Sequence, residues 1–313
     1  MNGSNGSEEK KLVDIYKRDT FWIYAFLIIL LVLTVAAFYR NSTPEWKRYQ
    51  ADYKNLLEQN IGKDAAAEFT PEIKQVWLKD ININKIDRCV SCHLGIDVRQ
   101  LTGDDIPKVF RMHPNNELIK KHPIKTFGCT PCHGGKGYAL TKEEAHFTDS
   151  KGWIDVFLSK ELAKKYGFED YEKMPLVEIN CNSCHVHEKE VAGFAHINKA
   201  KKNFDEKLCT CCHNFYGKGG LVGPDLTYEG DKPADLYDFA GIKTWEGLAP
   251  SVFSWHFLHF KHPYFVTLNT LMPNLNLKDE EIRALAMLVL SYKRVPEQFK
   301  VKPPAANVKA AGE

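Results

Sequence analysis

The sequence predicts a mainly α-helical protein with one N-terminal transmembrane helix, a middle region with little regular structure and a helical C-terminal domain. Three observations lead to this prediction. The run from Thr20 to Tyr39 contains no charged residue. Apolar residues recur at helical spacing after this run and again over residues 279–293. Residues 86–200 are instead rich in turn residues, histidines and paired cysteines.

The uncharged run is about long enough to span a bilayer. Basic residues precede it and aromatic residues stand at both ends, as at a membrane interface. A cleaved signal peptide is the alternative, but the apolar run is long for one, and Arg40-Asn41-Ser42 is a poor cleavage site. We therefore expect a cytoplasmic tail over residues 1–18 and an uncleaved anchor over residues 19–40.

A helical stalk is expected over residues 41–85. Thr43-Pro44-Glu45 predicts a helix start, with Thr43 as the cap and Pro44 in the first turn. A stripe of apolar residues follows at helical spacing: Trp46, Tyr49, Tyr53, Leu56 and Leu57. This stripe is expected to pack against the next domain or against a partner subunit.

Eight of the nine cysteines fall into one pattern, C-x-x-C-H, which occurs four times. The copies are Cys89/Cys92/His93, Cys129/Cys132/His133, Cys181/Cys184/His185 and Cys209/Cys212/His213. This pattern is the attachment sequence for c-type haem: two thiols bond the macrocycle and the histidine binds its iron. The sequence therefore predicts four covalent haems. Three of them fall in residues 86–200, where the macrocycles would supply much of the apolar core and leave little need for regular structure.

The fourth copy, CTCCH at residues 209–213, contains an extra cysteine. Cys211 cannot be an attachment residue, because it would need a histidine at position 215, where Phe215 stands. We expect Cys211 to be a buried free thiol that behaves as a small apolar residue. Zinc is the alternative for paired cysteines, but neither a zinc site nor a disulfide framework requires a histidine after every pair.

Composition and cofactor chemistry bear on partners and location. The 42 basic residues are scattered among 40 acidic ones, which gives no support to nucleic-acid binding. Because c-type haems are attached outside the bacterial cytoplasmic membrane, we expect a single-pass protein of that membrane. Its N-terminus would lie inside, and its haem domains would lie in the periplasm.

The C-terminal domain, residues 201–297, resembles a class I cytochrome c. The resemblance rests on CTCCH, on Gly223-Pro224-Asp225-Leu226-Thr227 and on Leu271-Met272-Pro273 before the last helix. With the stretch from Trp255 to His259, it is similar to the mono-haem subunit of cbb3-type oxidases. The resemblance implies that Met272 is the sixth iron ligand and that Pro224 supports His213.

Three smaller expectations concern this end of the chain. Lys278 stands where that family has a capping serine or threonine, which leaves the start of the last helix open. Met287, inside that helix, is expected to be a packing residue. Residues 298–313 have no periodicity and are expected to be a disordered tail.

The first half resembles another group, over most of residues 75–150. The stretches on which this resemblance rests are IDRCVSCHLGID, RMHPNNELIKKHPIKTFGCTPCHGGKGYAL and EEAHF. They resemble membrane-anchored multihaem cytochromes that accompany bacterial quinol-oxidising complexes containing cytochrome b. The resemblance implies that His113, His122 and His146 are distal ligands of three bis-histidine haems. Which histidine serves which haem stays open, and His187 and His196 are rivals for the third.

These features predict an electron-transfer subunit that passes electrons from bis-histidine haems to a His/Met haem. Expected partners are cytochrome b or Rieske-type quinol-oxidising subunits, and a downstream cytochrome or oxidase. We expect no substrate site, since no C-x-x-C-K motif occurs. Four intact motifs argue against a structural subunit with vestigial haems.

The main alternative is a self-sufficient tetrahaem quinol dehydrogenase with a single anchor. In that family the first motif lies close to the membrane helix, whereas here Tyr39 and Cys89 are about fifty residues apart.

Overall fold

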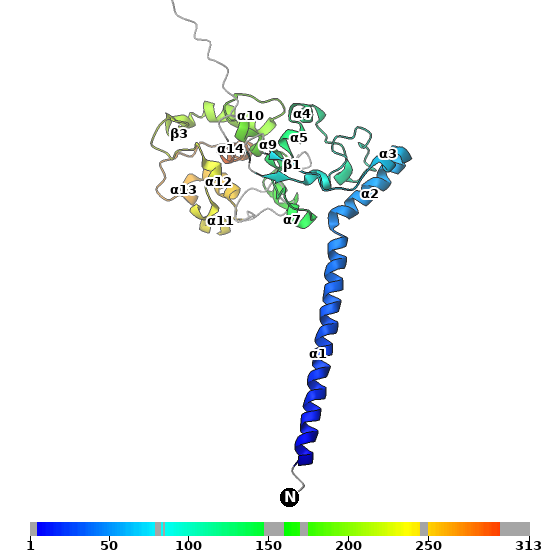
Figure 1. Cartoon of the computed structure of the whole chain (residues 1–313). Helices are drawn as coiled ribbons and strands as arrows, with labels where there is room; N and C mark the ends of the chain where they lie inside the picture. The colour runs from blue at the N-terminus through cyan, green and yellow to red at the C-terminus, as the bar shows by residue number, and fades with distance from the viewer. Residues whose placement is uncertain are drawn as a thin grey trace, which may run out of the picture.

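The computed structural model describes residues 5–78, 83, 85–146, 160–169, 175–244 and 250–294. The described part is mainly helical, as predicted, with two short antiparallel sheets of two strands each. A long N-terminal helix projects away from the rest of the molecule (Figure 1). The expected disordered tail, 298–313, lies outside the described residues.

Helix α1 (Asn5–Ser42) contains the predicted anchor and extends beyond it at both ends. Its segment Val13–Arg40 is long and apolar enough to cross a membrane, and an 18-residue stretch within it has a mean hydropathy of 2.7. None of this stretch is buried inside the protein. This apolar surface is therefore available to contact lipid.

Helices α2 (Glu45–Asn60) and α3 (Lys63–Glu68) follow. The predicted start of α2 is right, but the predicted cap is wrong. Pro44 occupies the N-cap position, and no side chain caps the helix. The Thr43 hydroxyl instead donates to the carbonyl of Tyr39 at 3.0 Å, because Thr43 is still bound to the last turn of α1.

The stripe on α2 packs against the segment that follows the first motif. Tyr53, Leu57 and Ala66 form one hydrophobic cluster with Leu94, Leu101, Ile106 and Phe110. The buried Gln50 adds polar contacts: its amide donates to the carbonyls of Glu72 (2.6 Å) and Ser91 (2.9 Å). The stalk therefore lies against the Cys/His-rich region.

The middle region has only short elements. The sheet pairs β1 (Val76–Trp77) with β2 (Ile86–Asp87). The helical turns are η2 (Cys89–Ser91), η3 (Lys108–Phe110), α4 (Asn116–Lys121), α5 (Ile124–Phe127), α6 (Thr130–His133) and α7 (Lys142–His146). None of these exceeds six residues. The expectation of little regular structure covered residues 86–200, however, and the later part of that range contains longer helices.

The remaining elements are longer on average. They are α8 (Lys160–Lys165), α9 (Val177–His185), α10 (Ala195–Glu206), η5 (Cys209–Cys211), β3 (Asn214–Phe215), β4 (Lys218–Gly219), η6 (Glu229–Asp231), η7 (Ala234–Leu236), α11 (Ala240–Thr244), α12 (Val252–Lys261), α13 (Pro263–Val266) and α14 (Asp279–Leu290). Strands β3 and β4 form the second sheet.

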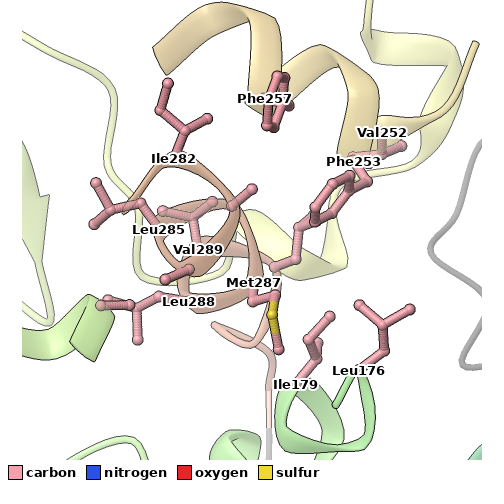
Figure 2. Close-up of a cluster of buried hydrophobic side chains, with 14 of the residues drawn as sticks. Leu176, Ile179, Val252, Phe253, Phe257, Ile282, Leu285, Met287, Leu288 and Val289 are labelled. Atoms are coloured by element: carbon pink, nitrogen blue, oxygen red, sulfur yellow. The ribbon is translucent and has the colours of Figure 1, made fainter. Parts of the chain in front are cut away.

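Helix α14 is the centre of the larger hydrophobic core and packs against α9, α10 and α12. Figure 2 shows Met287 of α14 beside Leu176 and Ile179, and its side chain is 0% exposed. Met287 is thus a packing residue. The backbone N–H of Lys278 donates to the Glu281 carboxylate at 2.8 Å, which starts the helix without a serine or threonine.

The larger core contains residues from both sides of position 200, from Ala163 to Tyr292. The predicted boundary between the two cofactor-binding domains falls inside α10. The third and fourth motifs therefore flank a helix that belongs to one shared core.

Candidate cofactor sites

The first, second and fourth motifs share one backbone turn. In each, the amide of the second cysteine and that of the histidine both donate to the carbonyl of the first cysteine, at 2.9–3.2 Å. The third motif instead ends helix α9. All four motifs therefore place two thiols and an imidazole on one short stretch of helical backbone. We number them motifs 1 to 4 in chain order.

Each histidine of motifs 1 to 3 faces a histidine from outside the motifs. The ring centroids are 6.1 Å apart for His93 and His146, 6.2 Å for His133 and His113, and 6.1 Å for His185 and His122. An imidazole nitrogen binds a metal ion at about 2 Å, so two rings on opposite sides of one ion have centroids roughly 6 Å apart. The structure thus brings together the three sequence-predicted distal histidines and three motif histidines, in a pairing that the sequence left open.

The rivals lie elsewhere. The ring of His187 packs 4.7 Å from that of Tyr216, and the ring of His196 lies 5.8 Å from that of Phe168. His122, rather than either of these, is the histidine that faces His185 at ligand-pair spacing.

Burial favours the metal-binding form of several paired imidazoles. It lowers the pKa of His93, His113 and His133 below the usual value. The neighbouring ring lowers the pKa further in two cases, His146 acting on His93 and His113 on His133. A neutral imidazole is the form that binds a metal ion.

Hydrogen bonds orient four of the candidate ligands through Nδ1. The partners are the carbonyl of Asn115 for His113 (3.1 Å), that of Leu118 for His122 (3.3 Å), the carboxylate of Glu188 for His185 (2.5 Å) and the carbonyl of Pro224 for His213 (2.9 Å). Where Nδ1 donates the bond, the lone pair is left on Nε2, as in most metal-bound histidines. For His113, the backbone N–H of Asn115 also lies 3.1 Å from Nδ1 and can donate to it.

Motifs 1, 2 and 3 contact one another in chain order. The sulfur atoms of Cys89 and Cys129 lie within 4.8 Å of each other, and the Cys129 thiol, then burial, raise the pKa of Cys89. Between motifs 2 and 3, the Cys132 thiol, then burial, raise the pKa of Cys181. The side chain of Asn180 also donates to the carbonyl of Cys132 at 2.9 Å. Motif 2 therefore lies between motifs 1 and 3.

This arrangement does not suit a zinc site. Among the described residues, which include every cysteine and histidine, one group places three donors within 4.8 Å: Asp87, Cys89 and Cys129. Its two cysteines come from different motifs, and their own partners Cys92 and Cys132 are not in the group. A structural zinc site built from C-x-x-C would use both cysteines of a pair.

Motif 4 opens onto a cavity of about 570 Å³. Cys209, Cys212 and His213 line it, as does Met272 from the loop before α14. A Cβ at Gly223 would come within 2.6 Å of the His213 ring, and the carbonyl of Pro224 accepts its hydrogen bond. Residues 223 and 224 therefore hold this imidazole in place, which is the role that the resemblance implied for Pro224.

Cys211 corrects a prediction. We expected a buried thiol, but its side chain is exposed and is not among those that line the cavity. The β3–β4 hairpin packs against the backbone of the turn: a Cβ at Gly220 would lie 2.1 Å from the carbonyl oxygen of Cys211. The backbone is covered there while the side chain points outward, so Cys209 and Cys212 remain the cavity-facing pair.

The cavity also contains a polar cluster that the sequence did not predict. Glu229 and His256 are each 5% exposed or less at the side chain and lie 3.2 Å apart. Tyr237 donates to Glu229 at 2.9 Å, and Lys232 contacts its other oxygen at 2.5 Å. Burial alone would raise the pKa of Glu229, but the hydrogen bond and charge of His256, with Lys232, lower it to about 2.

His259 is a second unpredicted lining residue. Burial, then the charges of His256 and His213, lower its pKa to about 4. Its ring stacks on Trp255 with centroids 4.8 Å apart. No spacing rule could identify these residues, because the cluster forms only where η6 meets α12.

Four sites thus follow one plan: a pair of cysteines, a histidine next to them, and a second candidate ligand brought in from elsewhere in the chain. No protein-family model, curated protein or solved structure matches the chain. The function is therefore inferred from these side chains and from the motifs that contain them.

Proposed function

We propose that the chain is a membrane-anchored, periplasmic tetrahaem cytochrome c that serves as the electron-transfer subunit of a quinol-oxidising, cytochrome b-containing respiratory complex. The observation that carries this proposal is the set of three histidine pairs, each with centroids 6.1–6.2 Å apart and each containing one motif histidine. If the histidines had come together by chance, we would not expect every pair to contain one histidine from a C-x-x-C-H motif and one from outside the motifs.

The residues fit four c-type haems. The thioether cysteines would be Cys89/Cys92, Cys129/Cys132, Cys181/Cys184 and Cys209/Cys212. The residues that would bind iron are the three histidine pairs and His213 with Met272. Bound haem supplies one-electron chemistry between ferric and ferrous iron. Hydrogen bonds through Nδ1 hold four of these imidazoles, those of His113, His122, His185 and His213. Burial lowers the pKa of His93, His113 and His133, which favours their neutral form.

The contacts between motifs support a linear path. Motif 1 touches motif 2, and motif 2 touches motif 3, through the cysteine contacts described above. Motif 4 lies beyond α10, next to the one thioether in the candidate ligand set. A methionine ligand raises the potential relative to histidine, so electrons would leave through motif 4.

The self-sufficient quinol dehydrogenase gains support from one contact. The Glu45 carboxylate lies close enough to Cys92 to raise its pKa, after the larger effect of burial. Glu45 begins α2 only three positions after the last residue of α1. Motif 1 therefore lies near the start of α2, which directly follows the membrane helix, so the fifty residues between Tyr39 and Cys89 do not exclude this alternative.

Intact-mass spectrometry of the denatured, fully matured protein tests the cofactor content. The expected mass is the polypeptide plus four haems, and three or fewer would contradict the proposal. Purification from the native membrane then separates the two functions. Co-purifying cytochrome b or Rieske subunits favour the complex, whereas quinol oxidation by the isolated chain favours the dehydrogenase.

A further inference from the structure

Asp87 is a fully buried carboxylate, 0% exposed, at the end of β2. One of its oxygens accepts the backbone N–H of Cys89 at 3.1 Å. The other accepts the N–H groups of Cys129 at 2.8 Å and Thr130 at 2.7 Å. A single side chain therefore caps the first turn of both motif 1 and motif 2, which lie about forty residues apart in sequence.

The surroundings of Asp87 are shaped to admit this carboxylate. Gly128 has a φ of +60°, and a Cβ there would approach the Asp87 oxygen to 2.9 Å. A Cβ at Gly137 would lie 3.2 Å from the Asp87 Cα. The backbone N–H of Arg88, next to Asp87, donates to the carbonyl of Gly137 at 2.7 Å. This hydrogen bond holds the end of β2 against the segment that follows motif 2.

The charge of Asp87 acts on both motif histidines. Burial lowers the pKa of His93 and His133, and the Asp87 charge opposes that lowering in both. Within the described residues, no lysine or arginine forms an ion pair with this carboxylate. Three backbone N–H groups satisfy its hydrogen bonds but do not neutralise it.

We propose that Asp87 is a positioning residue that fixes motifs 1 and 2 at one separation and lowers the reduction potentials of the two haems they would carry. This inference rests on the proposed function. A buried negative charge stabilises ferric over ferrous iron, because the ferric form carries one more positive charge, and a low-dielectric interior screens the interaction weakly. One carboxylate would thereby lower the reduction potentials of both haems of motifs 1 and 2, where electrons would enter the chain of haems.

The test is a spectroelectrochemical titration of the matured protein and its Asp87→Asn variant. We expect two of the four potentials to rise in the variant, and the other two to stay within error. The matched control is Asp97→Asn, which removes an exposed carboxylate four residues after His93 and should shift none. Unchanged potentials in Asp87→Asn, or an equal rise in all four, would overturn the inference.

A variant that loses haem is still informative. Peptide mass spectrometry would assign each missing haem to its motif, and Asp87→Glu, which keeps the charge, would be measured beside Asp87→Asn. Loss confined to motifs 1 and 2 in Asp87→Asn, with retention in Asp87→Glu, supports the positioning role. Loss spread over all four motifs contradicts it. A wild-type chain without four haems would overturn the proposed function itself, whereas a loaded wild type with an unresponsive Asp87→Asn overturns only this inference.

Discussion

At the level of single side chains, Met272 and His259 both line the motif 4 cavity, and each carries an atom that can bind iron. Met272 is the ligand we propose. Met272→His should lower the highest of the four potentials and remove the weak near-infrared band of iron–methionine charge transfer, because imidazole is the stronger donor to ferric iron. Absorbance and potential titrations measure both changes.

The control for Met272 is His259→Phe, which keeps an aromatic ring against Trp255 and should leave the band intact. A band that survives Met272→His would mean that the thioether ligand lies elsewhere. A wild type with no such band would lack a methionine ligand, and the reason for expecting electrons to leave through motif 4 would be lost.

The exposed Cys211 gives a second prediction. A maleimide should label the native protein once per chain, since the other eight cysteines would be bonded to haem. Cys211→Ser should abolish the label and keep four haems by mass. Loss of the fourth haem in that variant would show that the attachment register in CTCCH is wrong.

Glu229 makes stability depend on acid pH. Its pKa falls from 4.5 to about 2 on folding, which corresponds to about 3 kcal/mol. Because the folded state favours the charged form, this contribution is complete above pH 4.5 and disappears as the pH falls toward 2. Denaturant unfolding of wild type and Glu229→Gln should differ at pH 7 and converge near pH 2. A constant difference across that range would contradict the prediction.

At the level of elements, helix α2 is fastened to motif 1 by the amide of Gln50. Gln50→Leu would leave the carbonyl of Ser91 and both backbone groups of Glu72 without this partner. Each buried unsatisfied group costs about 1–3 kcal/mol, so the free energy of unfolding should fall by about 2 kcal/mol or more. Asn55→Leu, on the exposed face of the same helix, should change it by less than about 0.5 kcal/mol.

Elements with a strong local signal could be predicted from the sequence. Hydropathy identified α1, and the apolar period identified α14, although the residue at which α14 starts stayed open because of Lys278. The Thr43 cap failed because a neighbouring helix competed for its hydroxyl. The exposure of Cys211 was missed because a hairpin covers the backbone of that turn, which no local pattern encodes.

The site was predictable in kind but not in arrangement. The motifs identify four cysteine pairs and their histidines, because that chemistry requires fixed spacing. The partner of each histidine depends on contacts between distant segments, such as His122 with His185. Asp87 carries no motif signal at all, since its role appears only when two turns meet on one carboxylate.

For the whole molecule, the N-terminal helix should be separable from the rest. The apolar side chains of Val13–Arg40 are exposed, so they contribute little to the packing of the other helices. A chain that begins at Thr43, exported behind a cleavable signal, should be recovered without detergent and carry four haems. The full chain should stay in the membrane fraction after carbonate extraction. Loss of haem from the shortened chain would contradict this separation.

The hydrogen bond between Asn182 and Ser291 joins two segments that are synthesised far apart in time. Asn182 stands between the two cysteines of motif 3, and its amide donates at 2.7 Å to the Ser291 hydroxyl, 109 positions later. A ribosome makes this motif long before the helix that buries it. An enzyme that attached haem to motif 3 early would therefore act on a chain that is not yet packed. The last helix would then pack against a motif that already carries its haem. A premature stop near the C-terminus would do its damage far upstream, at the third motif as well as the fourth.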